Sequence, residues 1–294
     1  MSHLPLVSIV TPSYNQGNFI KDTLRSVKNQ SYPNIEHIVI DGGSTDNTLK
    51  ILEEYKDTYN LNWMSEQDKG QANAINKGFR IAKGEITTWI NSDDVYFDKN
   101  VIRDVVTKFL KTKEKLIYGD SVIINQDNLI CRVGVVRSDV NLSLLLKSCF
   151  PCQPSVFMKK EITEEHKLKE DLDYSFDYEY WLRLAKEGII FRHINRICAC
   201  RRRHSSAKSV SGTKNQNRQS TRLRKRYSKN PNSTVSFLNT LDLLLSGGFR
   251  RVEGIPKLLN IYLNRNDYEF AFEPRFDSIG RAVLRQLFYP YPIS

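Results

Sequence analysis

Short apolar runs alternate with amphipathic stretches through the first hundred residues of the chain. The runs are rich in β-branched residues and end at polar or turn-forming residues, which predicts strands. The predicted strands are Leu6–Val10, Ile35–Ile40, Leu61–Ser65 and Ile86–Ile90. Between them, apolar positions recur every three or four residues, the spacing of one helix face. The predicted helix faces are Ile20, Leu24 and Val27; Thr48, Leu49, Leu52 and Tyr55; and Ile75, Gly78, Phe79 and Ala82.

This alternation predicts an α/β fold with a mostly parallel, Rossmann-like sheet that helices cover on both faces, because buried parallel strands are apolar throughout. Three residues are expected to mark the limits of elements. Pro12 is expected to end the first strand, Asp46 to cap the second helix and Gly84 to stop the third.

Polar clusters follow the predicted strands, at the edge where parallel α/β sheets bind their ligands. The clusters are Thr11–Asn15, Asp41–Asp46, Glu66–Gly70 and Asn91–Asp94. Four such coincidences predict a binding site at this edge of the sheet.

The chemistry of this edge points to a phosphate-bearing ligand. The adjacent carboxylates of Asp93 and Asp94 need a cation or hydrogen-bond donors between them, and a divalent ion on a diphosphate fits that need. Asp41 can accept a hydrogen bond from a base or a sugar hydroxyl, or can simply close an Asx-type turn. The chain has neither a dinucleotide-binding G-x-G-x-x-G nor a P-loop motif, which disfavours an NAD-dependent oxidoreductase and a P-loop ATPase.

Four motifs in order resemble those of glycosyltransferase family 2, whose members have the GT-A fold. The matching stretches are Val7–Asn15, Ile38–Thr48, Asp68–Gly78 and Ile90–Asp94. The resemblance is strong over about the first 100 residues and looser to about residue 210. It implies an inverting transferase that takes a sugar from a nucleoside-diphosphate sugar, a UDP-sugar being favoured, with Mn²⁺ or Mg²⁺ as cofactor. The implied acceptor is a glycan or a lipid-linked sugar of surface polysaccharide or glycolipid synthesis.

The resemblance also implies roles for residues on the donor side. Pro12, Tyr14 and Asn15 would form the base pocket, and Asp41 would read the base edge. The turn Asp68–Gly70, which includes Lys69, would lie near the base, ribose and phosphates, together with Asn73. Asp93 would face the ribose or sugar, and Asp94 would hold the metal. The metal motif often begins with Asp, but Asn91 occupies that position here.

On the acceptor side, Cys152–Phe157 resembles the family segment between the two substrates, and Asp177 occupies the position of the general base. The residue before it is Phe176, where the family has Glu. Asp177 is expected at the start of an amphipathic helix, whose N-terminus favours the ionised carboxylate, and a helix cap is the alternative role. Asp173 and Glu179 are the competing carboxylates.

The run Arg201–Ser209 resembles the family's loop that follows the catalytic helix. Arg203 is implied there as a ligand of the diphosphate, and His204 as a ligand of the metal or of a phosphate. The segment from Ser205 to Gln219 is rich in Ser, Lys, Asn and Gln, which predicts a mobile lid.

The net charge of +11 is concentrated in one segment. Arg196–Lys229 contains twelve basic residues and no acidic one, so the rest of the chain, with 32 basic and 33 acidic residues, is close to neutral. Such a segment predicts a phosphate-bearing partner: the donor diphosphate at Arg201 to His204, and an anionic membrane face at Arg222 to Lys229. A solvated basic loop is the alternative. Nucleic acid is not expected, because only Tyr227 offers stacking.

The expected organisation is one GT-A domain over residues 1–222, with a nucleotide-sugar half (1–100) and an acceptor half (101–222), and a helical extension over 223–294. Two faces are predicted in the extension, followed by an amphipathic segment at 280–289. The faces are Phe237, Leu238, Leu241, Leu244 and Leu245; and Ile255, Leu258, Leu259, Tyr262 and Leu263. This extension is expected to pack on the domain or to bind an anionic membrane.

The N-terminus lacks a secretory signal, which predicts a cytoplasmic protein, with the inner face of the membrane as the alternative location. The five cysteines are expected to be ordinary thiols, with a zinc site as the weaker alternative.

Overall fold

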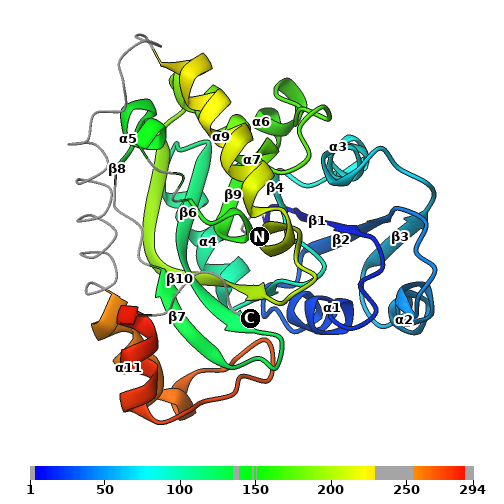
Figure 1. Ribbon diagram of the computed structural model, residues 1–294. Coiled ribbons are helices and arrows are strands. Elements are labelled where there is room, and N and C mark those ends of the chain that lie inside the picture. The colour runs from blue at the N-terminus through cyan, green and yellow to red at the C-terminus, as the bar shows by residue number, and fades with distance from the viewer. Residues whose placement is uncertain (1–3, 135–138, 148, 150, 229–253, 289–294) are drawn as a thin grey trace.

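The structure is a computed structural model that describes residues 4–134, 139–147, 149, 151–228 and 254–288. Its first half contains β1 (Val7–Ser13), α1 (Ile20–Lys28), β2 (Ile35–Asp41), α2 (Thr48–Tyr55), β3 (Leu61–Ser65), α3 (Gln71–Ile81), β4 (Ile86–Trp89), β5 (Val95–Tyr96), α4 (Val101–Lys111), β6 (Leu116–Asn125), β7 (Ile130–Gly134) and β8 (Asp139–Val140) (Figure 1). The rest contains α5 (Leu142–Lys147), η1 (Gln153–Ser155), β9 (Val156–Lys159), α6 (Lys160–Glu165), α7 (Phe176–Lys186), β10 (Phe191–Arg203), α8 (Lys208–Ser211), α9 (Thr213–Tyr227), η2 (Arg265–Asp267) and α11 (Ile279–Phe288), and residues 254–263 are also helical.

These strands form one sheet in the order β3-β2-β1-β4-β9-β6-β10-β5, with β7 beside β6 and β8 beside β10. The first four strands pair in parallel, as do β6 and β10. The other ladders are antiparallel and join β9 to β4 and β6, β7 to β6, and β10 to β5 and β8. The predicted α/β class with a mostly parallel sheet is confirmed.

Helices cover both faces of the sheet, as predicted (Figure 1). Ile9 of β1 belongs to the core cluster that contains Val27 of α1 and Val105 of α4. Its neighbour Val10 belongs to the second cluster, with Ile75 of α3 and Trp181 of α7. Successive strand residues point to opposite faces, so one short apolar run supplies both cores.

The first strand does not end before Pro12 as predicted but continues to Ser13. Odd-numbered residues of β1 bond toward β2, since the Val7 N–H donates to Asn34 O at 3.0 Å. Even-numbered residues face β4, and the last bond on that side runs from the Ile90 N–H to Val10 O at 2.9 Å. The backbone nitrogen of Pro12, which carries no hydrogen, therefore faces the side on which β4 has already ended. The sheet loses no hydrogen bond as a result.

Two further limits differ slightly from those predicted. The N-cap of α2 is Asn47, one residue after Asp46, although the Asp46 carboxylate accepts the N–H of Thr48 at 3.0 Å. Helix α3 ends with Ala82 as its C-cap, so Gly84 does not stop it. Gly84 allows a close approach to β1 instead, because a Cβ there would lie 2.6 Å from the backbone nitrogen of Ser8.

The basic segment Arg196–Lys229 lies partly in strand β10 and partly in helices α8 and α9. Composition alone did not predict this division. The first part of the segment lies in β10, where Arg196 pairs with Asp98 and Asp104 and Arg202 pairs with Asp22. Most of the predicted lid lies in helices α8 and α9, and α9 runs across the predicted domain limit at residue 222. That limit and the mobility of the lid stay predictions.

In the extension, the predicted face at 237–245 lies outside the described residues. The following helix buries Leu258, Ile261 and Tyr262, whereas the predicted Leu263 is 68% exposed. Among the residues that the structure describes, no helix is both long enough and apolar enough to span a bilayer.

Candidate active site

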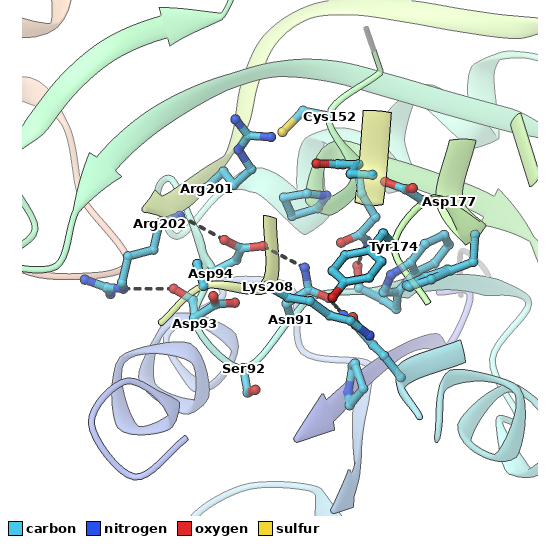
Figure 2. A pocket seen from close by; sticks show the side chains of 18 of the residues that line it. Asn91, Ser92, Asp93, Asp94, Cys152, Tyr174, Asp177, Arg201, Arg202 and Lys208 are labelled. Carbon is cyan, nitrogen blue, oxygen red and sulfur yellow. Dashed lines mark hydrogen bonds between the residues drawn. The ribbon is translucent and has the colours of Figure 1, made fainter. Parts of the chain in front are cut away.

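A cavity of about 1010 Å³ opens at the carboxyl ends of β1 and β4 and extends beneath the start of α7 and α9. It is lined by side chains from both predicted halves of the domain. Figure 2 shows Asp93 and Asp94 on one side and Asp177 on the other, with Tyr174 and Lys208 between them in this view. The polar cluster Asn91–Asp94 and the helix of Asp177 therefore reach one cavity, as the sequence indicated.

Asp94 is the most deeply buried carboxylate of this group, with 1% of its surface exposed. Its Oδ1 accepts the backbone N–H of Arg202 at 2.9 Å, and its Oδ2 accepts Nδ2 of Asn91 at 3.1 Å. Burial, together with the nearby Asp93 carboxylate, raises the pKa of Asp94 well above its usual range. The Asn91 amide can donate to Asp94, whereas an ionised Asp at this position could only accept and would repel Asp94.

Asp93 and His204 form a second polar pair beside Asp94. Oδ2 of Asp93 lies 3.0 Å from Nε2 of His204, whose Nδ1 lies 2.8 Å from Oγ of Ser206. The His204 ring packs on Phe19, with ring centroids 4.3 Å apart. These contacts fix the imidazole within the cavity wall.

The fully buried guanidinium of Arg202 holds this wall together. Its Nε donates to the carbonyl oxygen of Asp93 at 2.8 Å, and its Nη2 pairs with Asp22 of α1 at 3.0 Å. It also lies over the Phe19 ring, 5.2 Å from the centroid. Arg202 therefore positions the Asp93–Asp94 turn from behind.

Asp177 lies in the first turn of α7, where the helix N-cap is Ser175, so Asp177 is not the cap. Its Oδ1 accepts the N–H of Tyr178 at 2.7 Å. The helix N-terminus favours the ionised carboxylate, but burial acts in the opposite direction here. Burial raises the pKa of Asp177, because loss of water outweighs the Tyr178 N–H and the Arg201 charge.

The two competing carboxylates differ in their surroundings. Glu179 is fully buried, pairs with Arg183 and Lys169 at 3.0 Å each, and accepts the hydroxyl of Tyr227 at 2.6 Å. It is a structural carboxylate outside the cavity. Asp173 lines the cavity but is exposed.

On the donor side, Pro12, Tyr14 and Gly70 line the cavity as predicted, and Tyr14 is 60% exposed. Asn15 and Asp41 do not line it. The buried Asp41 carboxylate accepts the Ser44 N–H at 2.8 Å and the Ser65 hydroxyl at 2.7 Å. Asn15 accepts the Thr45 N–H at 2.9 Å. In this conformation both residues shape the loop behind the pocket.

Three other predicted residues lie outside the cavity lining. Asn73 donates to Glu170 at 2.9 Å, and Lys69 is exposed beside it. Arg203 is buried, 5% exposed, at the end of β10. The arginines of this run that reach the cavity are Arg201 and Arg202.

Several lining residues were not singled out from the sequence. Gln71 donates to Asn91 Oδ1 at 2.8 Å, and Gln153 donates to the Trp89 carbonyl oxygen. Nζ of Lys208 lies 5.3 Å from the centroid of the Tyr174 ring. Lys208 belongs to the run Arg201–Ser209 quoted above, but nothing in that run set Lys208 apart from its neighbours.

The chain's own metal donors are few. Among the described residues, no group of three or more histidine, cysteine or acidic side chains is arranged to hold a metal. Asp94 with Asp93 and His204 therefore fits a divalent cation only if oxygens of a bound diphosphate complete its coordination. Cys198 and Cys200 are buried in the core, which agrees with ordinary thiols.

Comparisons with known proteins agree with this geometry. The family model described as Glycosyl transferase family 2 matches residues 8–166, more than half of the chain. An uncharacterized glycosyltransferase of Rickettsia prowazekii, RP339, is 30% identical over 199 residues, which are 64% of this chain and 61% of that protein. The chain thus matches about three fifths of that relative. WfaP of Escherichia coli, a UDP-Glc:alpha-D-GlcNAc-diphosphoundecaprenol beta-1,3-glucosyltransferase, is 29% identical over 75% of this chain and 86% of its own.

Two solved structures share the fold. S. aureus TarS residues 1–349 in complex with UDP-GlcNAc superposes with a TM-score of 0.60 at 16% identity, over 97% of this chain and 91% of that one. The mannosyltransferase PcManGT of Pyrobaculum calidifontis, in complex with GDP-Man and Mn²⁺, gives 0.58 at 17% identity, over 85% and 71%. The family match and the shared fold together establish that the chain belongs to glycosyl transferase family 2.

Proposed function

We propose that the protein is a metal-dependent, inverting glycosyltransferase that moves a sugar from a nucleoside-diphosphate sugar to an acceptor hydroxyl. The observation that carries the proposal is the opposed placement of Asp93–Asp94 and Asp177 in one cavity. The UDP-GlcNAc of TarS and the name of WfaP support a UDP-sugar as donor and a lipid-linked glycan as acceptor, in surface polysaccharide or glycolipid synthesis.

On the donor side, the residues supply an anchor for the diphosphate. A divalent cation, Mn²⁺ or Mg²⁺, held by Asp94 with His204 as a second candidate ligand, would neutralise charge on the phosphates. Arg201 and Lys208 bring positive charge into the same cavity. Charge develops on the diphosphate as it leaves, so these cations stabilise the transition state more than the ground state.

On the acceptor side, Asp177 acts as the general base. Its carboxylate takes the proton of the acceptor hydroxyl, and the oxygen attacks the anomeric carbon opposite the diphosphate. The bond from the anomeric carbon to the phosphate oxygen breaks, and its electron pair leaves with the nucleoside diphosphate. A raised pKa suits this task, because a base works best when its pKa lies near the working pH.

A screen of nucleotide-sugars for slow hydrolysis, with and without Mn²⁺, tests the proposal. We expect one donor class to be hydrolysed, faster with the metal, and UDP-sugars to lead. A nucleotide-sugar that binds without turnover, even with a range of lipid-linked and glycan acceptors, would favour a binding protein that lacks transferase activity.

The role of Asp94 has its own test. We expect Asp94→Ala to abolish the metal-dependent part of UDP binding, because the buried carboxylate is the main donor to the metal. Calorimetric titration of UDP with and without Mn²⁺ measures this. Asp173→Ala is the control, since Asp173 is an exposed carboxylate that lines the same cavity. Equal metal dependence in Asp94→Ala and the wild-type protein would contradict the assignment.

A further inference from the structure

The solvent side of α9 carries a row of positive charges, which we call the basic face of α9. It consists of Lys214, Arg218, Arg222, Lys225 and Arg226. All five side chains are exposed. Four of them follow one another at intervals of four residues, and the fifth lies on the same side, so they share one face of the helix. At 1.5 Å per residue, the row is about 18 Å long.

These charges have no described acidic partner. Within the described residues, no ion pair joins any of the five to Asp or Glu, whereas Arg196 and Arg202 of the same sequence segment are both paired. Like charges four residues apart on a helix repel one another. The basic face therefore weakens α9, and its concentration on one side calls for an external anionic partner.

The opposite side of α9 is fixed to the active-site cavity. Leu223 is buried, 5% exposed, and the Tyr227 hydroxyl donates to Glu179 of α7 at 2.6 Å. Gln216 and Ser220 line the cavity. Figure 1 shows α9, in yellow, running from the upper edge of the molecule toward its middle, across α7. Since a helix with its side chains is about 10 Å across, the basic face lies about one helix diameter from the cavity.

We propose that the basic face of α9 binds the anionic surface of a lipid bilayer and thereby holds the cavity against the membrane. The inference rests on the proposed function, in which the acceptor is a lipid-linked glycan. A lipid-linked acceptor keeps its reactive hydroxyl near the headgroups, so the enzyme must present its cavity to that surface. Electrostatic attraction of Lys and Arg to anionic headgroups supplies this orientation.

The chemistry of the face distinguishes headgroups from other anionic partners. It carries no exposed aromatic residue, and Tyr227 is engaged with Glu179, so a nucleic acid would gain charge contacts without base stacking. It also carries no exposed large apolar residue. The face therefore lies on the headgroup layer without inserting into the acyl chains.

Vesicle flotation of the full chain tests the inference. The vesicles contain phosphatidylglycerol mixed with phosphatidylcholine, or phosphatidylcholine alone. We expect the triple variant Arg218→Gln, Arg222→Gln, Arg226→Gln to lower partitioning onto the anionic vesicles about 100-fold. This follows from about 1 kcal/mol per basic residue at the surface and tenfold per 1.4 kcal/mol. Raised salt should lower the partitioning of the wild-type chain in the same way.

A matched variant controls for net charge: Lys50→Gln, Lys111→Gln, Lys113→Gln removes three exposed lysines far from α9 in sequence. It should float like the wild-type chain. Equal flotation of the two triple variants would overturn the inference. The inference would also be overturned if the wild-type chain bound neutral and anionic vesicles equally. It would be overturned as well if the wild-type chain bound soluble polyphosphate or RNA but no anionic vesicles.

Titration of UDP separates this inference from the proposed function. The basic-face variant should bind UDP as the wild-type chain does. If the wild-type chain bound no nucleotide-sugar at all, the proposed function would fail, and flotation would then report on membrane binding alone.

Discussion

The carboxyl group of Asp177 is subject to opposing influences on its pKa, and burial prevails. A raised pKa moves the change from inactive acid to active base toward higher pH. We therefore expect the turnover rate to rise with pH through a range above that of an ordinary carboxylate, which titrates near 4. Steady-state rates measured across pH at saturating donor give this profile. A rate that is constant down to pH 4 would contradict the assignment of Asp177.

Substitution of the same residue separates binding from chemistry. Asp177→Asn keeps the shape of the side chain and removes the base, so we expect turnover to fall about 10²- to 10⁴-fold with UDP affinity unchanged. Asp173→Asn is the matched control, because Asp173 is an exposed carboxylate in the same cavity. If Asp173→Asn lost turnover and Asp177→Asn kept it, the base would be Asp173.

A buried histidine in β2 should make the fold sensitive to acid. His37 is fully buried between the hydroxyls of Thr11 (2.9 Å) and Tyr59 (2.7 Å), and burial lowers its pKa to about 3. The unfolded chain binds a proton near pH 6.5 and the folded chain does not, so the stability that this histidine contributes is present above pH 6.5 and is lost as pH falls toward 3. We expect up to about 1.4 kcal/mol per pH unit from this group.

Urea unfolding between pH 7 and pH 5 measures this loss. His37→Gln should remove part of the pH dependence even if it lowers stability overall. Identical slopes in His37→Gln and the wild-type protein would contradict the prediction.

At the scale of elements, the join between α8 and α9 is tightly fitted to the cavity. A Cβ on Gly212 would lie 1.9 Å from Cε1 of Tyr174, so the absence of a side chain there lets the Tyr174 ring lie against the helix start. We expect Gly212→Ala to cost about 1–3 kcal/mol, the usual cost of overpacking. Urea unfolding measures it.

A double variant shows whether the clash is the cause. Gly212→Ala combined with Tyr174→Ala should recover most of the loss caused by Gly212→Ala, because residues in contact give non-additive effects. Simple additivity of the two substitutions would mean that the loss has another origin, such as a change in α9 itself.

The elements of the first hundred residues could be predicted because each pattern there has one physical cause. Continuous apolar runs gave β2 to β4 to within one residue and β1 without its last three residues, and three- or four-residue spacing placed the helices α1 to α3. Pro12 was misjudged because its effect depends on where the neighbouring strand ends. Segments whose role depends on partners far along the chain, such as Arg202 with Asp22, leave no local pattern.

The same limit applies to the candidate site. The sequence indicated Asp93, Asp94, Asp177 and His204, and the fold brings all four to one cavity. It indicated Arg203, whereas Arg201 lines the cavity. Both are arginines in one run, and only packing decides which one reaches the cavity. Nor could the sequence show that the Asp41 carboxylate is already occupied by Ser44 and Ser65.

At the scale of the whole molecule, the C-terminal extension is joined to the main sheet rather than added beside it. Backbone bonds link Lys99 to Glu269 at 3.0 Å and Arg275 to Asn128 at 2.9 Å. Leu258 belongs to the same buried cluster as Ile9 of β1. The extension should therefore unfold together with the sheet, in one transition.

Leu258 and Leu263 lie five residues apart in one helix and provide a test of this union. Leu258 is fully buried and Leu263 is 68% exposed. We expect Leu258→Ala to cost about 2–5 kcal/mol and to shift the whole unfolding curve. Circular dichroism and tryptophan fluorescence should show the same shift. Fluorescence reports on the rest of the molecule, because all three tryptophans lie outside the extension. Leu263→Ala should change stability by less than about 0.5 kcal/mol. If Leu258→Ala instead produced a separate early transition, seen in circular dichroism and not in fluorescence, the extension would be an independent unit.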